Sequence, residues 1–327
     1  MNAIDKAIVG RRIKGLREEH GLSQAELADR LGISPQAVSK WESGVTLPDV
    51  EILLGISILF EVSINEILTG KDIFSSLANR EFITKNNIAY FVPEEENADN
   101  IEWANAMTRD GWIKKNWEGH KQNRFHRDTA EKVNTHGGTI LEIGAGPGGG
   151  FMPEILLEKP EACVILSDLS PTVVREWKKL FDVELYPTNI HYAVLDTCDL
   201  PFKDGCMDIV SGAGAFQNIE GGSKIKALHE IYRVLKPGGL YVASDGFVSQ
   251  DRLKALPEHA QIALTEKFPD AFEDYFAATV AVGFKTIDNK VSTYAWSTAN
   301  DKSNFSDLAR ELGVEVIWSG YKRYCVK

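Results

Sequence analysis

The feature that most constrains the fold is a run of apolar segments, alternating with helical ones, that begins near residue 137. The segments expected as strands are 139–146, 163–170, 190–197, 207–216 and 238–246, with further strands within 286–297 and 314–326. Amphipathic helices are expected at 224–235 and 303–312. Continuous apolar strands separated by helices are typical of a mostly parallel sheet covered on both faces. The sequence therefore predicts a doubly wound α/β domain.

Residues 1–70 have a different pattern, in which short helices are separated by tight turns. An amphipathic helix is expected at 4–19. Ser23 is placed to cap the next helix, and Glu26 three residues later completes a capping box. Ser34-Pro35 then begins another helix, with the serine as cap and the proline in the first turn. This pattern predicts a small all-α domain at the N-terminus.

The chain has 327 residues, which is enough for about two domains. The segment 71–135 lies between the two patterns, and we expect it to form a linker and a helical cap or lid before a domain at 136–327. An aromatic set in it could cover a ligand or pack as part of the linker; its members are Tyr90, Trp103, Trp112 and Trp117.

Composition excludes several classes of protein. The formal net charge of −11 argues against coating nucleic acid through bulk charge. No stretch reaches the roughly 18 apolar residues of a membrane span, and the N-terminus lacks the apolar run of a secretory signal. The four cysteines show no C-x-x-C spacing, which favours reduced thiols. We therefore expect a cytoplasmic protein with no membrane partner and no bound metal.

The clearest chemical signal is the glycine-rich run at 144–150, directly after the first strand. Glycines let the chain turn sharply and let its backbone approach a ligand. The spacing also fits the G-x-G-x-x-G of dinucleotide-binding proteins, so an NAD-type site stays open on this motif alone. Asp168 ends the second strand, 20 residues after Gly148, where its carboxylate can accept hydrogen bonds from ribose hydroxyls in either kind of site.

Three features favour S-adenosylmethionine over a dinucleotide. Glu142 lies inside the first strand, where its charge is costly unless a cationic ligand offsets it directly or through water. Asp196 follows the third strand and is placed near an adenine edge. S-adenosylmethionine has no phosphate, so backbone groups and carboxylates suffice to bind it.

Four segments in this order, LEIGAGPGGG, SDLSP, LDTCDLPFKDGCMDIV and ALHEIYRVLKPGGLYV, resemble the class I S-adenosylmethionine-dependent methyltransferases over 137–245. The resemblance implies a Rossmann-like methyltransferase fold with a doubly wound, mostly parallel seven-stranded sheet. It places the glycine loop along the methionine part of the cofactor, the second strand at the ribose, the third at the adenine and the fourth beside the methyl group. The cofactor-binding residues that it implies are Glu142, Gly144, Ala145, Gly146, Gly148, Asp168, Leu169, Asp196, Thr197, Ser211, Gly212 and Ala213.

The segment 211–218 bears on the methyl acceptor. It contains neither the Asn/Asp-Pro-Pro-aromatic motif nor the Pro-Cys nucleophile of DNA-methylating enzymes of this fold, so it resembles the branch that methylates small molecules. That branch often has a His-His pair where Gln217-Asn218 stand here. Methyl transfer depends largely on alignment in a dry pocket, and a general base is needed only for a protonated acceptor. His126 is the candidate base, with a solvent-exposed or capping histidine as the alternative.

Residues 11–68 resemble the Cro/repressor family of helix-turn-helix domains through RRIKGLREEHGLSQAELADRLGISPQAVSKWESGVTLPDVEILLGISILFEVSINEIL. The resemblance makes Gln24–Leu31 the first helix of the motif and Pro35–Ser43 the recognition helix, whose N-terminal part enters the major groove. Val38 and Trp41 are expected in the core. Base edges and phosphates would be contacted by Gln36, Ala37, Ser39, Lys40, Gln24 and Ser34.

Charge leaves a second interpretation of this domain open. Residues 1–71 carry a net charge of −2, which suits a protein-interaction or vestigial domain, yet the first 17 residues carry +4. DNA binding is the favoured interpretation, and a homodimer is expected because such domains read palindromes.

The sequence therefore predicts a methyltransferase of a small molecule coupled to sequence-specific DNA binding. The alternative is a transcriptional regulator whose methyltransferase-like domain only senses S-adenosylmethionine or another ligand. A dinucleotide-dependent oxidoreductase is the third hypothesis.

Overall fold

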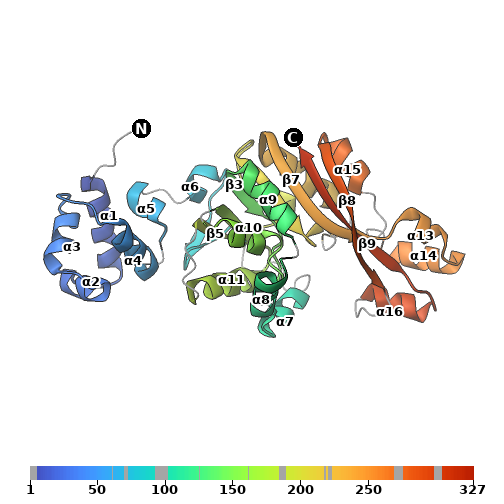
Figure 1. The fold of residues 1–327 in the computed structure, drawn as a ribbon, viewed down its shortest axis with the longest axis horizontal. Helices are drawn as coiled ribbons and strands as arrows, with labels where there is room; N and C mark the ends of the chain where they lie inside the picture. The colour runs from blue at the N-terminus through green and yellow to red at the C-terminus, as the bar shows by residue number, and fades with distance from the viewer. Residues whose placement is uncertain are drawn as a thin grey trace. The chain divides into compact units, whose positions relative to one another are not determined.

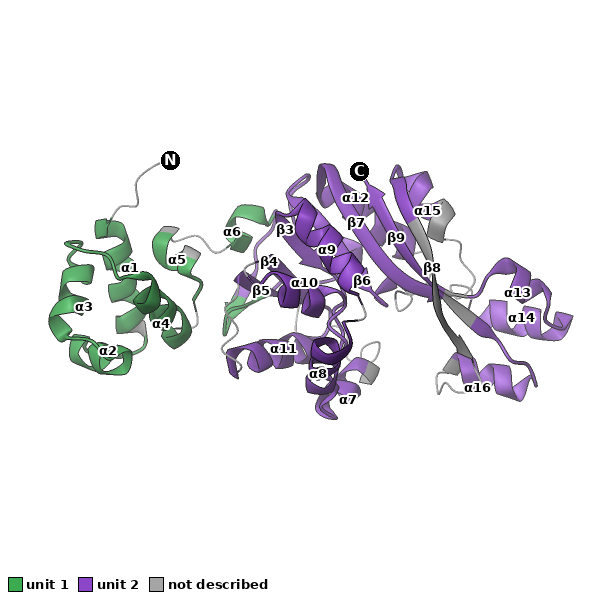
Figure 2. Ribbon diagram, viewed as in Figure 1, with its two compact units in different colours: residues 1–78, 84–89 green, residues 79–83, 90–327 purple. Residues whose placement is uncertain are grey.

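The computed structural model describes residues 6–60, 62–69, 73–92, 102–124, 126–160, 162–183, 189–216, 219, 223–268, 275–297 and 304–327. The chain divides into two compact units, residues 1–78 with 84–89 and residues 79–83 with 90–327, which we describe separately (Figure 2). Among the described helices, none is both long and apolar enough to cross a membrane.

The first unit is helical, as the sequence predicts (Figure 1). Its helices are α1 (Lys6–Glu19), α2 (Gln24–Leu31), α3 (Pro35–Glu42), α4 (Val50–Phe60), α5 (Ile64–Thr69) and α6 (Ile73–Leu77). Apolar residues from α1 to α5 form one core, in which Ile13, Leu27, Val38 and Ile56 are fully buried. Trp41 also belongs to this core, so the expected positions of Val38 and Trp41 are confirmed.

Local chemistry fixes the ends of α2 and α3. The hydroxyl of Ser23 accepts from the backbone N–H of Glu26 at 3.2 Å, and the Glu26 carboxylate accepts from the N–H of Ser23 at 2.7 Å. This confirms the predicted capping box. Gly32 ends α2 in the left-handed conformation, with φ 65°. Ser34 caps α3 by accepting from the N–H of Ala37, so the turn between the two helices is set by these few residues.

Outside the helical residues 6–77, the chain is built on one central sheet, to which residues 84–89 of the first unit also belong. The strands are β1 (Ile83–Lys85), β2 (Ile88–Tyr90), β3 (Thr139–Glu142), β4 (Cys163–Asp168), β5 (Asn189–Val194), β6 (Met207–Ala213), β7 (Leu235–Phe247), β8 (Lys285–Ser297) and β9 (Ile317–Val326). Their order is β1-β2-β5-β4-β3-β6-β7-β9-β8. The sheet of the described residues thus has nine strands, and the expected number of seven is wrong. The two extra strands, β1 and β2, turn at Asn86-Asn87, which both have positive φ as in a tight hairpin turn.

The order and direction of the strands indicate where a ligand site would lie. Strands β5, β4, β3, β6 and β7 are parallel, while β9 is antiparallel to both β7 and β8. The chain moves from β3 outward through β4 to β5, and then returns to the other side of β3 as β6. Ligands of open α/β sheets bind at such a reversal, beyond the carboxyl ends of the strands. The ends of β3, β4 and β6 therefore define the region of interest.

Helices cover both faces of the sheet. They are α7 (Glu102–Arg109), α8 (Trp112–Asn123), α9 (Arg127–His136), α10 (Met152–Glu158), α11 (Pro171–Val183), α12 (Ser223–Val234), α13 (Gln250–Lys254), α14 (Glu258–Lys267), α15 (Tyr275–Val282) and α16 (Asn304–Glu311). On β9, Tyr324 bonds to Thr129 of α9 at 2.9 Å, and the adjacent Arg323 bonds to Thr279 of α15 at 2.5 Å. Successive strand residues point to opposite faces, so α9 and α15 lie on opposite sides. This confirms the doubly wound arrangement.

The sequence interpretation missed one part of this unit. Helices α13, α14 and α16 gather around a small apolar cluster of their own, which includes Leu253, Leu264 and Phe305 (Figure 1). Two of these helices lie between β7 and β8, in a segment for which the sequence predicted no element.

Candidate functional site

The glycine loop between β3 and α10 is tightly packed on one side. The glycines with positive φ are Gly144, Gly146, Gly149 and Gly150. A Cβ on Gly149 would lie 2.6 Å from the Trp177 ring, and one on Gly150 would lie 1.8 Å from Oε1 of Glu142. No side chain fits at either position, so these two glycines are needed by the protein's own packing. The sequence interpretation had not assigned a role to either of them.

The other side of the loop is open. Within the described part of the chain, no heavy atom would lie within 4 Å of a Cβ added to Gly148. Gly144, in contrast, lies against the segment that follows β6, where a Cβ would come 2.9 Å from the Cβ of Ala215. A Cβ on Gly212 would lie 3.1 Å from the carbonyl oxygen of Ile143. The loop therefore packs against the end of β6 and leaves open space beside Gly148.

Three side chains hold the carbonyl groups of the loop. The indole N–H of Trp177 donates to the carbonyl of residue 146 at 2.8 Å. From α8, the amide of Asn116 donates to the carbonyl of residue 147 at 3.0 Å, and Nε2 of His120 donates to that of residue 148 at 3.2 Å. These bonds fix the orientation of the peptide groups at 146–148. The roles of Asn116 and His120 were missed, because no sequence motif marks residues that reach the loop from a separate helix.

Glu142 lies fully buried beneath the loop. Its Oε1 accepts from the backbone N–H of Phe151 at 3.0 Å, and its Oε2 accepts from the hydroxyl of Ser211. Burial raises the pKa of this carboxyl group to about 8, against the effect of both hydrogen bonds. The sequence interpretation expected a cationic ligand to offset the charge; in the structure Phe151 and Ser211 supply the contacts.

Asp168 joins the end of β4 to the glycine loop. Its Oδ2 accepts from the N–H of Gly146 and its Oδ1 from the N–H of Ser170, each at 2.8 Å. Burial raises the pKa of this carboxyl group, although these backbone bonds favour its charged form. The side chain keeps 8% exposure, and each carboxylate oxygen can accept more than one hydrogen bond. Leu169 beside it is half-buried.

The segment after β5 is held by its own cap. Oδ1 of Asp196 accepts from the N–H of Cys198 at 2.8 Å and caps the short 3-10 helix Thr197–Asp199. Asp196 and Thr197 are both half-buried. Burial, followed by the nearby Asp196 carboxylate, raises the pKa of Cys198 to about 12, so its thiol is not a nucleophile.

The residues expected beside the methyl group differ in how deeply they are buried. Ser211 is fully buried and its hydroxyl belongs to the contacts of Glu142, while Gly212 is buried against Ile143. Ala213 is half-buried at the end of β6. Ala145 is buried and its N–H donates to the carbonyl of residue 167. Gln217 and Asn218 lie outside the described residues.

His126 occupies the cap position of α9, although within the described residues its side chain makes no capping hydrogen bond. Its backbone N–H donates to Oε1 of Glu154 at 2.6 Å, and its ring meets Phe151 edge-on. Burial, followed by the charge of Lys322, lowers the pKa of His126 to about 4. The ring lies on the α9 side of the sheet.

The aromatic residues of the expected lid differ in their surroundings. Trp117 is fully buried and packs edge-on against Phe181 of α11, with ring centroids 5.2 Å apart. Trp112 is 41% exposed, and Tyr90 is half-buried. The side chain of Trp103 lies outside the described residues. Trp117 is therefore a packing residue of the cap, and whether Trp112 covers a ligand stays a prediction.

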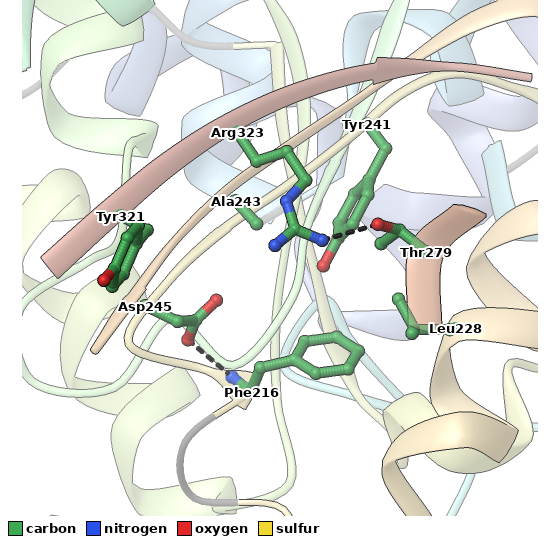
Figure 3. Close-up of a pocket in the computed structure, with 8 residues that line it drawn as sticks. All are labelled: Phe216, Leu228, Tyr241, Ala243, Asp245, Thr279, Tyr321 and Arg323. Carbon is green, nitrogen blue, oxygen red and sulfur yellow. Dashed lines mark hydrogen bonds between the residues drawn. The ribbon is translucent and has the colours of Figure 1, made fainter. Parts of the chain in front are cut away.

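A hollow of about 20 Å³ lies between the second half of β7 and the middle of β9, beside α12 and α15 (Figure 3). Its walls are Phe216, Leu228, Tyr241, Ala243, Asp245, Thr279, Tyr321 and Arg323. Oδ1 of Asp245 accepts from the N–H of Phe216 at 3.0 Å, and Arg323 is only 5% exposed. The sequence interpretation missed both charged residues. Asp245 follows an apolar strand, as Asp168 does, and that position could have identified it.

In the first unit, α3 presents the expected DNA-facing residues in part. Gln36, Ser39 and Lys40 are exposed, and Ala37 is half-buried against the core. Ser34 is exposed, but its hydroxyl caps α3.

Gln24 is engaged within the domain. Its amide donates to Oε2 of Glu42 at 2.8 Å. The Glu42 carboxylate also accepts two hydrogen bonds from the guanidinium of Arg17, at 2.6 and 3.0 Å. Burial alone would raise the pKa of Glu42, but the hydrogen bonds from Arg17 and Gln24 outweigh it, and the pKa is lowered. Arg17 therefore belongs to an internal ion pair, and the basic first helix has one charge fewer to offer DNA than its sequence indicates.

Comparison with known proteins identifies two domains. Residues 13–67 match the helix-turn-helix family, and residues 140–239 match the methyltransferase domain family. Over 64 residues, 20% of this chain and 31% of the relative, the chain is 41% identical to the HTH-type transcriptional activator BcrR of Enterococcus faecalis. Over 146 residues, 44% of this chain and 54% of the relative, it is 28% identical to the demethylmenaquinone methyltransferase of Symbiobacterium thermophilum.

The chain thus spans about a third of the first relative and about half of the second. Among solved structures, the geranyl diphosphate C-methyltransferase of Streptomyces coelicolor is 15% identical, with a TM-score of 0.44 over 61% of this chain and 79% of that one. The chain therefore contains a segment, 13–67, that matches helix-turn-helix domains and a segment, 140–239, that matches methyltransferase domains. The resemblances of the two segments to helix-turn-helix and methyltransferase domains are confirmed, while the cofactor and the small-molecule acceptor stay predictions.

Proposed function

We propose that the protein is an S-adenosylmethionine-dependent methyltransferase of a small molecule, and that its N-terminal domain binds a specific DNA site. The observation that carries the first part is the bond between Asp168 and Gly146, which holds the end of β4 against the glycine loop beside the free space at Gly148. The match of residues 140–239 to a methyltransferase family supports it.

The donor set of this site fits S-adenosylmethionine. Asp168 can accept from ribose hydroxyls with lone pairs that Gly146 and Ser170 do not use. Asp196 can accept from an adenine amino group, with the backbone of Thr197 beside it, and the 3-10 helix keeps that segment in place. The bare backbone of Gly148 gives the methionine part room to approach. When bound, this cofactor supplies a methyl group on a sulfonium, which passes to a nucleophilic atom of the acceptor as the carbon–sulfur bond breaks.

The chain's own contribution is alignment of the acceptor with the donor. The bonds from Trp177, Asn116 and His120 hold the loop rigid, which favours a fixed approach of acceptor to donor. A protonated acceptor also needs a group that takes its proton. Asp245, at the end of β7 next to the segment that follows β6, is better placed for this than His126, which lies on the α9 side of the sheet.

DNA binding is proposed through α3. Gln36 and Lys40 are exposed on the helix that the family match makes the recognition helix, so they can reach base edges and phosphates. We further propose that two copies of the chain bind a palindromic site, since one such domain reads only half of it. A cytoplasmic location would suit a protein that binds DNA.

The experiment that tests the cofactor site is titration calorimetry of the full-length chain with S-adenosylmethionine and, separately, with NAD. We expect binding of the first only, and a loss of at least tenfold in affinity for Asp168→Ala. Asp204→Ala, a change of an exposed carboxylate that pairs with Arg233 away from the loop, is the control and should leave affinity unchanged. Unaltered affinity of Asp168→Ala would show that the cofactor lies elsewhere.

A methyl-transfer assay distinguishes an enzyme from the alternative, a regulator that only senses the cofactor. The chain is incubated with methyl-labelled S-adenosylmethionine and a cell extract freed of macromolecules. An enzyme transfers label to a small molecule, whereas a sensor binds the cofactor and transfers none.

A further inference from the structure

The hollow between β7 and β9 carries charges of opposite sign, from Asp245 and Arg323 (Figure 3). We propose that this hollow selects the methyl acceptor, and that the acceptor is a small molecule with an acidic group and, close to it, an amine or hydroxyl donor. An amino acid or a hydroxy acid has this chemistry. The inference rests on the proposed methyltransferase function and names its substrate class.

The hollow adjoins the methyl end of the proposed cofactor site. Gly144 of the glycine loop is packed against Ala215, and the next residue, Phe216, forms a wall of the hollow. The N–H of Gly214 donates to the carbonyl of Ser244 at 2.7 Å, so the segment after β6 is fixed to β7 as well as to the loop. A molecule that enters the hollow therefore lies close to the part of the loop assigned to the methionine.

The two charged groups face the same space. In the antiparallel pair β7–β9, Arg323 is opposite Ala243 and Tyr321 is opposite Asp245. Ala243 and Asp245 are two residues apart on one strand, so they share a face. The short side chain of Ala243 leaves room between the charges, and Figure 3 shows Arg323 and Asp245 both directed into that room.

Arg323 is the group suited to an acid. It is only 5% exposed and lies on the wall of the hollow, so its guanidinium keeps a fixed position there. The hydroxyl of Thr279 accepts from Nη1 at 2.5 Å. A guanidinium has five N–H donors in a planar fork, and this fork matches the two oxygens of a carboxylate. Phe216 and Tyr241 form apolar walls beside it.

Asp245 is suited to the second group. Its Oδ1 accepts a hydrogen bond from the N–H of Phe216. This bond fixes the carboxylate beside the segment that follows β6. A carboxylate accepts several hydrogen bonds, so an amine or hydroxyl of the ligand can donate to it. The hollow measures about 20 Å³ and is too small for a whole acceptor molecule. Only the acid end of the acceptor would enter it, with the donor group between Asp245 and the glycine loop.

The test is binding of matched small probes to the full-length chain saturated with S-adenosylhomocysteine, measured by ligand-observed NMR. Each set contains a small amino or hydroxy acid, its amide, and the same acid without the amine or hydroxyl. We expect the complete acid to bind at least tenfold more tightly than either of its partners in most sets.

Four variants assign the effect to residues. Arg323→Met keeps the length of the side chain and should remove the preference for acid over amide, while Arg323→Lys should keep part of it. Asp245→Asn retains an acceptor for the N–H of Phe216 and should remove the preference for the donor group. Lys322→Met is the matched control, since it removes a positive charge from the adjacent residue, which pairs with Asp128 on the opposite face. It should change nothing.

The proposal would be overturned if the wild type bound the acid and its amide equally well. It would also be overturned if the preference for the acid persisted in Arg323→Met. If Arg323→Met does not fold, Arg323→Lys and Asp245→Asn decide the question. Binding of S-adenosylhomocysteine is measured for every protein in the series. Its absence in the wild type would contradict the proposed function itself, whereas its presence without any acid preference would contradict only the substrate class.

Discussion

Gly150 lies directly over the carboxylate of Glu142, so close that a Cβ on the glycine would come within 1.8 Å of Oε1. The buried acid and the bare backbone are therefore one structural unit, in which Glu142 receives the N–H of Phe151 and supports the loop from below. Gly148, two residues earlier, has no such neighbour among the described residues. Two glycines in one motif thus have different physical reasons to be glycine.

This contrast gives a matched pair of substitutions. Gly150→Ala places a Cβ against Glu142 at a positive φ of 59°, so we expect a loss of about 2 to 4 kcal/mol in the free energy of unfolding. Gly148→Ala has space for its methyl group and should change stability by less than about 0.5 kcal/mol. The same methyl group would fill the proposed ligand space, so affinity for S-adenosylmethionine should fall at least tenfold. Urea unfolding and calorimetry measure the two effects, and equal stability of both variants would contradict the packing at Gly150.

Three groups make stability depend on pH, namely the fully buried Glu142 and the half-buried His126 and His191, the last of which lies on β5. Burial lowers the pKa values of His126 and His191 to about 4 and raises that of Glu142 to about 8. Between pH 4.5 and 6.5 the unfolded chain binds two more protons at the histidines and one fewer at Glu142, so stability rises with pH. Between 6.5 and 8, of these three groups only Glu142 differs: the folded chain holds the extra proton, and stability falls. Each net proton contributes about 1.4 kcal/mol per pH unit.

We therefore expect maximal stability of the ligand-free chain near pH 6.5, measured as the urea midpoint across the range. Glu142→Gln should remove the decline above pH 6.5 and leave the rise below it. A decline that persists unchanged in Glu142→Gln would show that another group causes it.

The two side chains that reach the loop from α8 should support cofactor binding. Asn116→Ala and His120→Ala each remove one hydrogen bond to a loop carbonyl, worth about 1 kcal/mol. Affinity for S-adenosylmethionine should therefore fall roughly fivefold in each case. Lys115→Ala, next to Asn116 on the same helix and exposed, is the control. A loss in Lys115→Ala as large as in the other two would mean that α8, rather than its bonds to the loop, is responsible.

How much of the site the sequence predicts depends on how local each contact is. The capping box of Ser23 and Glu26 was found because both partners lie within one turn of helix. Asp168 was found because it follows an apolar strand at the expected distance from the glycines, and the structure places it against Gly146. In both cases a short stretch of sequence was enough to identify the residues and to predict their place in the fold.

Contacts between distant segments left no such pattern. Asn116 and His120 approach the loop from a helix about 30 residues earlier, and nothing in their own surroundings indicates it. Arg323 reaches the hollow because β9 inserts beside β7, an order that the sequence does not specify. Arg17 was counted as a surface charge, and only the fold shows it paired with Glu42. The contacts of these residues depend on how distant segments are arranged in the fold. Short sequence patterns do not show that arrangement.

The last prediction concerns DNA and separates the two kinds of polar residue in the first unit. Gln36→Ala combined with Lys40→Ala should abolish binding to the best site recovered from random sequences, because both side chains are exposed on α3. The double variant should unfold at the same urea concentration as the wild type. Lys40→Ala alone should also reduce the slope of log affinity against log salt by about 0.9, if its ammonium neutralises one phosphate.

Arg17→Met is the contrasting variant. It leaves the buried Glu42 carboxylate without its ion pair, so we expect a loss of about 3 to 5 kcal/mol in the free energy of unfolding. Its salt slope for DNA, measured at a temperature where it is folded, should equal that of the wild type because Arg17 faces the interior. A domain that mediates protein interaction would select no DNA site at all, and its stability would still respond to Arg17→Met. The combination of a normal salt slope with a lowered unfolding midpoint therefore tests the internal ion pair independently of the DNA hypothesis.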